Sequence, residues 1–254
     1  MLTVRSQLFE AFERSAFEGF VEEMIERAWQ YSPHLCKTLK DEELELAVRS
    51  AIKRAAGHGF TQRGPARFFV ETSIALGSEF DEDPQYPWAA ETLASDVFWS
   101  PMDKADALHA QVVKHFERVE PTPRDALLRL RALAGGPLPL ADASLAPGIA
   151  QILREVHPEK VEAVGDAALG RLVDAGLHKS EALGFDAPRA RLLVVALMFV
   201  VGHAFDRDPF LPWIARTLEP ERGGADDRAR VAERLERRAM IWIEAVLDAS
   251  ERDI

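Results

Sequence analysis

Two pairs of aspartates are the residues of this chain best suited to ligand chemistry. Asp81 and Asp83 are followed 125 residues later by Asp206 and Asp208. Carboxylates at alternate positions can hold a cation, but a calcium loop between helices also has glycine at its sixth position and glutamate at its twelfth. Counted from the first aspartate of each pair, those positions hold Tyr86 and Thr92, and Leu211 and Thr217. We therefore predict no metal site and no cofactor.

Histidines and nucleophiles give no catalytic motif either. The seven histidines form no His-Glu-x-x-His motif and no cysteine and histidine cluster with zinc spacing. His109 and His115 are six residues apart, a separation that puts two side chains on different faces of a helix. His203, three residues before Asp206, is expected to make a structural contact at a helix end. Motifs for serine nucleophiles, phosphate loops and dinucleotides are absent, so we predict no catalytic residues and no enzyme.

The strongest pattern in the chain is an internal repeat. The stretch 33–93 aligns without gaps with 158–218, and 17 of the 61 paired positions are identical. Ten of these identities fall in the last 17 positions, where both copies contain Phe-Asp-x-Asp-Pro-x-x-Pro-Trp. We interpret the chain as two copies of one unit at an offset of 125 residues.

The shared segment can be explained by backbone structure alone. The phenylalanines anchor the end of a helix, and an aspartate before proline is held in extended backbone, where its carboxylate caps the amides that follow. The later proline suits the first turn of a helix, and the tryptophan packs a large ring whose N–H needs an acceptor. We predict this structural role for Phe80, Asp81, Asp83, Pro84, Pro87, Trp88, Phe205, Asp206, Asp208, Pro209, Pro212 and Trp213.

Apolar residues recur at helical spacing along almost the whole chain, which predicts an all-α fold. We expect two tandem homologous helical lobes, at 1–120 and 149–254. The linker at 121–148 is rich in proline and glycine and is expected to hold a short helix at 124–133. Asp41 is predicted to cap a helix.

The two predicted central helices, 66–79 and 190–204, differ in polarity. The second is apolar on every side from Leu192 to Val201, so it is expected at the heart of the molecule. The first carries Glu71, Thr72 and Ser73 at the corresponding positions. We expect this polar face to meet solvent, with the lining of a shallow cleft as the alternative.

Composition restricts the partners and the compartment. A formal net charge of −11 and a pI near 5.2 disfavour nucleic acid as a partner. The single cysteine, Cys36, cannot form an intrachain disulfide and is expected to pack as a small apolar side chain. The amino terminus does not have the pattern of a secretion signal. The longest apolar run, Leu192 to Val201, is too short to span a bilayer. We expect a cytoplasmic protein with no membrane span.

The ordered features of the chain resemble a family of small bacterial helical proteins whose genes often accompany those of type VI secretion spikes and effectors. The resemblance is carried by Val4-Arg5-Ser6-Gln7, the break at Ser32-Pro33, the helix from Asp41, and Gly77-Ser78-Glu79-Phe80-Asp81-Glu82-Asp83-Pro84 with Pro87-Trp88-Ala89. It recurs in Gly202-His203-Ala204-Phe205-Asp206-Arg207-Asp208-Pro209 with Pro212-Trp213. It implies a cellular setting and no catalytic site.

The leading hypothesis is a protein-binding module that recognises a secreted toxin or spike component, either as an immunity protein or as an adaptor or chaperone. Its expected contact residues are Glu71, Thr72, Ser73, Glu79 and Glu82. One alternative is an enzyme with an unrecognised helical active site that depends on metal through the aspartates. A second alternative is a structural module that associates with itself.

Overall fold

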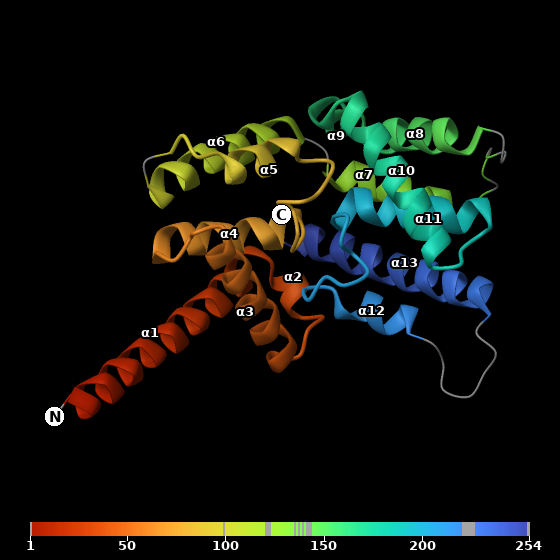
Figure 1. Ribbon diagram of the computed structural model, residues 1–254. Coiled ribbons are helices and arrows are strands. Elements are labelled where there is room, and N and C mark those ends of the chain that lie inside the picture. The colour runs from red at the N-terminus through yellow and green to blue at the C-terminus, as the bar shows by residue number, and fades with distance from the viewer. Residues whose placement is uncertain are drawn as a thin grey trace.

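Every regular element in the described part of the chain is an α-helix, which confirms the predicted all-α class (Figure 1). The computed structural model describes residues 2–98, 100–119, 123–134, 136, 138, 140, 144–219 and 227–252, with side chains from residue 11 to residue 248 of these ranges except residue 123. The motif residues Val4 to Gln7 therefore have a helical backbone, and their side chains lie outside the described part. The helices are α1 (Leu2–Tyr31), α2 (Pro33–Cys36), α3 (Asp41–Gly57), α4 (Arg63–Leu76), α5 (Pro87–Ala94), α6 (Pro101–Val119), α7 (Pro123–Ala134), α8 (Leu145–Val156), α9 (Pro158–Val164), α10 (Asp166–Ala182), α11 (Pro188–Val201), α12 (Pro212–Leu218) and α13 (Arg228–Arg252).

The helix boundaries follow the offset of the sequence repeat. Adding 125 to the bounds of α3 (41 and 57) gives those of α10 (166 and 182), and adding it to the bounds of α4 (63 and 76) gives those of α11 (188 and 201). α3 and α10 also end alike. The N–H of Phe60 donates to Ala55 O at 3.0 Å, and the N–H of Phe185 donates to Ser180 O at 2.8 Å. These are the six-residue hydrogen bonds of a Schellman cap, so the same local signals shape both helices.

Three predicted helix ends are corrected by the structure. α3 starts at Asp41 itself, and its N-cap is Lys40, whose N–H donates to the Glu43 carboxylate at 3.0 Å. Asp41 instead joins two further acidic residues in the first turn, where negative charge favours the helix dipole. The central helices α4 and α11 end at residues 76 and 201, three residues earlier than predicted, because Gly77 and Gly202 follow with φ near +104° and +103°.

The second central helix lies inside the molecule, as predicted. Val194 and Val195 of α11 are fully buried, and no residue of α11 is exposed. Its neighbours are α8, α10 and α13, and its carboxyl end reaches the first half of the chain. An apolar helix with no polar stripe must be covered on all sides, and these contacts provide that cover.

The predicted linker at 121–148 is only partly described. Its short helix is confirmed as α7, and residues 121, 122, 135, 137, 139 and 141–143 lie outside the described part. α8 begins at Leu145, four residues before the predicted start of the second lobe at residue 149. Pro147 and Gly148 lie inside its first turn, where proline is tolerated because the first N–H groups have no partner within the helix.

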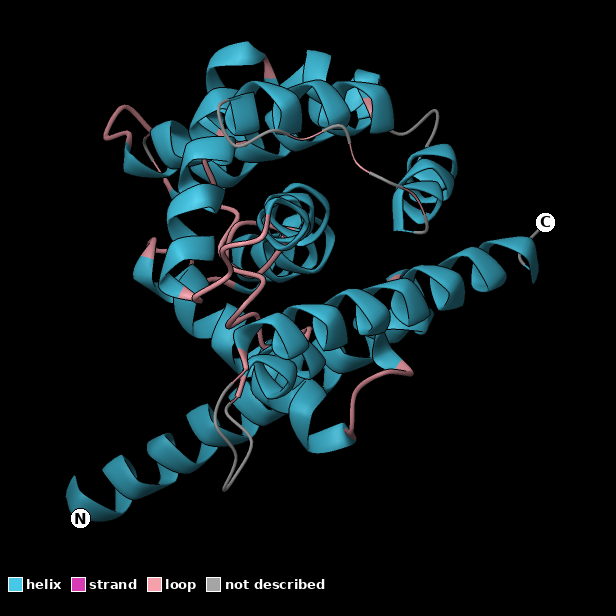
Figure 2. Ribbon diagram, turned by 90° about the vertical axis from the view of Figure 1, so that its right-hand side faces the viewer, coloured by secondary structure: helices cyan, strands magenta, loops and turns pink. Residues whose placement is uncertain are grey.

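The two halves are joined by an exchange of contacts between their last helices. α6 packs on α4 and α5 of its own half and on α9 of the second half. α13 packs on α11 and α12 of its own half and on α2 of the first half. Figures 1 and 2 show α13 running across the molecule toward the first half, while the amino-terminal part of α1 extends away from the body. Among the helices described, none has the length and apolar composition of a membrane span.

Candidate functional site

The two repeated corners meet at Gly77 and Gly202, the residues that directly follow the central helices. A Cβ built on Gly77 would lie 2.7 Å from the carbonyl oxygen of Val201 and 3.3 Å from Cα of Gly202. A Cβ built on Gly202 would lie 3.0 Å from the carbonyl oxygen of Leu76. The backbones of the two halves therefore cross in direct contact, and glycine is required at both positions by space and by positive φ.

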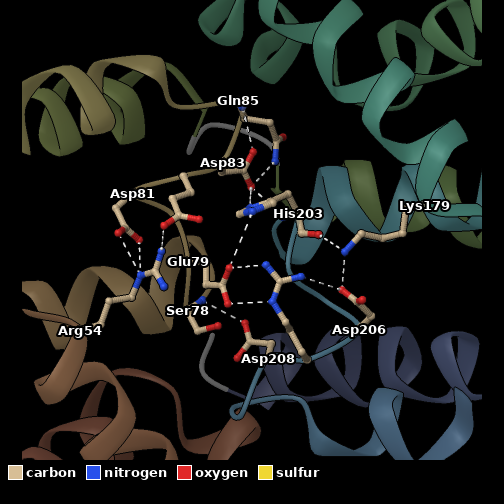
Figure 3. Close-up of polar contacts among 12 residues, drawn as sticks. Arg54, Ser78, Glu79, Asp81, Asp83, Gln85, Lys179, His203, Asp206 and Asp208 are labelled. Carbon is tan, nitrogen blue, oxygen red and sulfur yellow. Dashed lines mark hydrogen bonds and ion pairs between the residues drawn. The ribbon is translucent and has the colours of Figure 1, made fainter. Parts of the chain in front are cut away.

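A reciprocal pair of carboxylates holds this crossing together (Figure 3). Asp83 accepts the N–H of His203 at 2.8 Å, and Asp208 accepts the N–H of Ser78 at 3.0 Å. The other oxygen of each carboxylate accepts an N–H two residues on, from Gln85 and from Phe210, both at 2.8 Å. Sequence reasoning predicted these local caps and missed the bonds that cross to the opposite half. We call the four bonds the crossed caps.

Burial of the crossed caps changes the pKa of Asp208. Its side chain is held away from water, and this burial raises the pKa of Asp208 above its ordinary value, although the N–H groups of Ser78 and Phe210 act in the opposite direction. Asp83 is also buried and accepts a further hydrogen bond from the Gln85 amide at 3.2 Å. The space between the two corners is too small for a water molecule. The corners thus serve packing and leave no room for a substrate.

The first aspartate of each corner pairs with a base from its own half. Arg54 on α3 donates to Asp81 at 2.7 Å, and Lys179 on α10 donates to Asp206. Burial alone would raise the pKa of Asp81, but hydrogen bonds from His58 and Arg54 lower it on balance. These aspartates link the corners to α3 and α10, and a basic side chain balances the charge of each carboxylate.

The remaining residues of the motif pack in the core or start helices. Phe80 and Phe205 are fully buried, in the turns after α4 and α11 rather than on the helices. Pro87 and Pro212 are the first residues of α5 and α12, which follow the turns containing Pro84 and Pro209. Trp88 and Trp213 are half-buried against the core. The indole N–H of Trp213 has no acceptor among the described residues, contrary to expectation.

Glu79, Glu82 and His203 are the one group of described residues close enough to hold a metal, with ligand atoms within 4.8 Å of one another. Both glutamates already have basic partners. Arg207 donates to Glu79 at 2.9 Å, and Arg54 lies 2.8 Å from Glu82. Burial raises the pKa of Glu79, but the hydrogen bond from Arg207 lowers it on balance. The arginines supply the positive charge that a cation would bring.

The polar face predicted on the first central helix is mostly buried. Thr72 and Ser73 are 3% and 1% exposed, and their hydroxyls donate to the carbonyls of Phe68 and Phe69, each at 2.9 Å. Glu71 is partly covered and pairs with Arg27 of α1 at 2.6 Å. Solvent exposure was therefore the wrong expectation for Thr72 and Ser73, because their hydroxyls are satisfied by their own helix.

A cluster of basic and aromatic side chains lines a cavity that sequence reasoning did not identify. The cavity has a volume of about 350 Å³ and lies between the ends of α4, α6, α8 and α11, with α7, α9 and α13 contributing to its walls. Its polar lining is His34, Tyr86, His115, His157, Lys160 and Trp242. No aspartate or glutamate is among the described residues that line it. We call it the basic cavity.

Lys160 is the most unusual residue of the basic cavity. It is 8% exposed, its ammonium donates to the carbonyl of Phe199, and it lies 4.7 Å from the centre of the Phe199 ring. None of the ion pairs in the described part of the chain includes it. Burial lowers the pKa of Lys160 to about 8, against the opposite influence of Asp83. An ammonium ion has three donors, so two remain for a ligand.

The neighbours of Lys160 are neutral near pH 7. Burial and then the charges of Lys160 and His157 lower the pKa of His115 to about 4, and burial and Lys160 likewise lower the pKa of His157. Burial raises the pKa of Tyr86 well above its ordinary value. The rings of Tyr86 and His115 meet edge to face at 5.1 Å. The cavity therefore offers one cation and several neutral hydrogen-bonding groups.

A second cavity occupies the corresponding place in the other half of the repeat. It has a volume of about 240 Å³ and is lined by Ser32, Leu35, Ile74 and Leu211, among others. Adding 125 to the first three numbers gives 157, 160 and 199, and subtracting 125 from 211 gives 86; these are His157, Lys160, Phe199 and Tyr86 of the basic cavity. We call this second space the counterpart cavity. The same scaffold therefore surrounds a cavity with a lysine in one half and a cavity with a leucine at the corresponding position in the other.

Comparison of the chain with models of protein families, with curated proteins and with solved structures finds no match. The site must be interpreted from its own geometry. The crossed caps join the halves, whereas the basic cavity has the space and the unpaired charge that a ligand needs.

Proposed function

We propose that this protein is a protein-binding module that recognises a partner through the projecting part of α1. The observation that carries the proposal is the exposure of large aromatic side chains on this helix. Phe12 is 66% exposed and Phe17 is 40% exposed, and every residue from 11 to 19 is exposed to solvent. An exposed helix with aromatic residues is suited to binding in an apolar groove of another protein.

Charge indicates what kind of groove would fit. Between residues 11 and 31, α1 carries five acidic side chains and two basic ones, and the whole chain has a net charge of −11. A groove with apolar walls and a basic rim complements such a helix. Of the contact residues predicted from the sequence, Glu82 has an exposed side chain and Glu79 and Glu71 are paired with arginines, so α1 replaces them as the main contact surface.

The resemblance of the repeated segments supplies the proposed setting. The partner would be a secreted toxin or spike component of a type VI secretion system, and the protein would act in the cytoplasm as an immunity protein or as an adaptor. Neutralising a toxin requires that the complex block its activity, whereas an adaptor leaves the toxin active and promotes its export. A toxin assay on the purified complex separates these two roles.

The test is binding between the full chain and the effector or spike protein encoded beside it, measured by calorimetry. Changing Phe12 and Phe17 together to glutamate should weaken the complex at least tenfold, since aromatic anchors commonly supply more than 1.4 kcal/mol each. Val97→Glu is the matched control, because Val97 is 75% exposed and lies outside α1. Unchanged binding in the double variant would disprove the proposed surface. A concentration-dependent oligomer that the double variant abolishes would instead assign α1 to self-association.

A further inference from the structure

We propose that the basic cavity binds an amphipathic organic anion, with a carboxylate held by Lys160 and an apolar chain lying along the walls. This site is separate from the protein-binding surface of α1 and does not depend on it. Its basis is the chemistry of the lining. In a chain with 42 acidic and 31 basic residues, the described lining of this cavity has one lysine, three histidines and no carboxylate.

The counterpart cavity shows that the fold does not need the lysine. The residue 125 positions before Lys160 is Leu35, which is 8% exposed, as is Lys160. Leucine therefore fills this position in one half, while the other half buries an ammonium ion that has no acidic partner within ion-pair distance in the described part of the chain. Burying an unpaired charge is costly. A bound anion would supply the missing partner.

Other polar groups of the cavity are placed to bind the same ligand. The ammonium of Lys160 lies 5.9 Å from the centre of the Tyr86 ring, and Tyr86 contacts His115. None of the hydrogen bonds in the described part of the chain uses the Tyr86 hydroxyl or the His115 ring. At the position 125 residues after Tyr86 the chain has Leu211, and after His115 it has Met240. Lys160, Tyr86 and His115 therefore have apolar residues, Leu35, Leu211 and Met240, at the positions 125 residues away.

The apolar walls of the cavity determine the kind of chain that the ligand can carry. An apolar space of about 70 Å³ adjoins the basic cavity, and the two share Leu130, Val200 and Trp242. This second space is lined almost entirely by aliphatic side chains from α7, α8, α11 and α13. A volume of about 350 Å³ is at the lower end of the range of roughly 300 to 1,000 Å³ found for small-molecule sites. A chain of medium length fits these dimensions.

Octanoate, octylamine and octanol are suitable probes, because they share a chain and differ in the charge of the head group. Calorimetry on the full chain should show octanoate binding at least tenfold more tightly than octylamine or octanol, since a hydrogen bond to a charged group contributes a factor of about ten or more. Equal binding of the three probes, or no binding of octanoate, would refute the proposal.

Two variants locate the site. Lys160→Leu introduces the residue of the counterpart cavity, so it is expected to fold and to lose the preference for octanoate. Lys53→Met removes the same charge from an exposed position on α3 and should leave binding unchanged. Ala75→Phe narrows the cavity from an exposed position on its lining and should weaken all binding in the site. Octanoate binding that survives both Lys160→Leu and Ala75→Phe would place the ligand elsewhere and overturn the assignment.

The pH dependence gives a check that does not rely on folding of the variants. Octanoate binding should be nearly constant from pH 6 to about 8 and then weaken up to tenfold per pH unit as free Lys160 loses its proton. The other charged or titratable groups around the lysine and its cavity are His34, Asp83, Tyr86, His115, Arg118, Arg129, His157 and Glu159. An affinity that stays constant through pH 10 would contradict a role for the ammonium.

Discussion

The basic cavity and the counterpart cavity occupy equivalent positions in the repeat but have different linings. Lys160, His157 and Tyr86 on one side correspond to Leu35, Ser32 and Leu211 on the other. The surrounding scaffold agrees closely, since α3 and α4 have the same bounds as α10 and α11 at an offset of 125 residues. Leucine at two of these positions shows that the fold does not need the lysine or the tyrosine there, and that the charged lining has another purpose.

The crossed caps show the opposite behaviour. Asp83 and Asp208 make the same two backbone contacts, and Gly77 and Gly202 approach each other at the same point. Where both halves need a residue for the backbone, both contain it. Agreement between the halves therefore marks structural positions, and disagreement at buried polar positions marks candidates for ligand binding.

The largest effect on stability is expected when a lysine is introduced into the counterpart cavity. Leu35→Lys should lower the free energy of unfolding by roughly 4 kcal/mol, because it loses apolar burial and buries an ammonium ion. Asp208 is the one carboxylate among the described residues that line this cavity, and it already accepts two N–H groups. Urea denaturation measures the change, with Leu35→Met as a control of about 1 kcal/mol. If Leu35→Lys left the free energy of unfolding nearly unchanged, the two cavities would accommodate a lysine equally well.

The crossing of the halves should be almost as sensitive. Gly77→Ala is expected to cost roughly 3 to 4 kcal/mol and Gly202→Ala roughly 2 to 3 kcal/mol, because positive φ is strained for alanine and the added methyl meets backbone. The order follows from the distances, since the new Cβ would lie 2.7 Å from an oxygen at Gly77 and 3.0 Å at Gly202. Thermal or urea unfolding of both variants checks it. Two harmless substitutions would show that the halves do not touch there.

Much of the scaffold follows from the sequence because its causes are local. Apolar spacing predicted the helices, and the offset of 125 residues predicted which helices correspond. Helix ends were less certain, since Gly77 ends α4 earlier than the apolar pattern suggests. The crossed caps were half predicted. The bond from Asp83 to Gln85 is a local property of an aspartate before proline, whereas the bond to His203 depends on how the halves pack.

The basic cavity was beyond sequence reasoning for a related reason. Tyr86, His115 and Lys160 come from segments far apart in the chain, and no spacing connects them. Exposure of Thr72 and Ser73 was wrongly predicted, because a hydroxyl can be buried when it donates to a carbonyl of its own helix. One sign was present in the sequence. The aligned repeats place Lys160 opposite Leu35, and a charge at a position that elsewhere in the chain is apolar indicates a specialised site.

Alkaline titration tests the comparison of Lys160 with Leu35 directly. The folded state lowers the pKa of Lys160 from an ordinary value of 10.5 to about 8, so the unfolded chain binds more protons between these values. The free energy of unfolding therefore rises with pH between these two values, by up to roughly 1.4 kcal/mol per pH unit. It falls again as pH is lowered toward 8. Lys160→Leu should be more stable than the unchanged protein at pH 7, and this excess should shrink by roughly 2 kcal/mol between pH 8 and pH 10.

Tyr86 also titrates at alkaline pH, but its contribution to the free energy of unfolding is common to Lys160→Leu and the unchanged protein, so it cancels in the difference between them. Burial raises the pKa of Tyr86, so that its stabilising effect is present below pH 10 and is lost as pH rises further. Urea unfolding at several pH values below 10 gives the required curves. A constant difference between the variant and the unchanged protein would show that Lys160 is solvated like an ordinary surface lysine.

The smallest effect is expected from exchanging one acceptor of the crossed caps. Asp83→Asn and Asp208→Asn keep the side-chain shape and one acceptor oxygen, and each places an amide NH₂ against a backbone N–H. Leaving one buried donor unsatisfied costs roughly 1 to 2 kcal/mol. Asp83→Asn should cost slightly more, because Asp83 also accepts from the Gln85 side chain, while Asp208 has Phe210 at the corresponding place. Chemical denaturation of both single variants and the double variant measures these losses of stability.

The two bonds cross one small interface, so we expect the double variant to lose less stability than the sum of the single losses. Strict additivity would show that the two bonds act independently, and the halves would then be joined mainly by the packing of α6 on α9 and of α13 on α2.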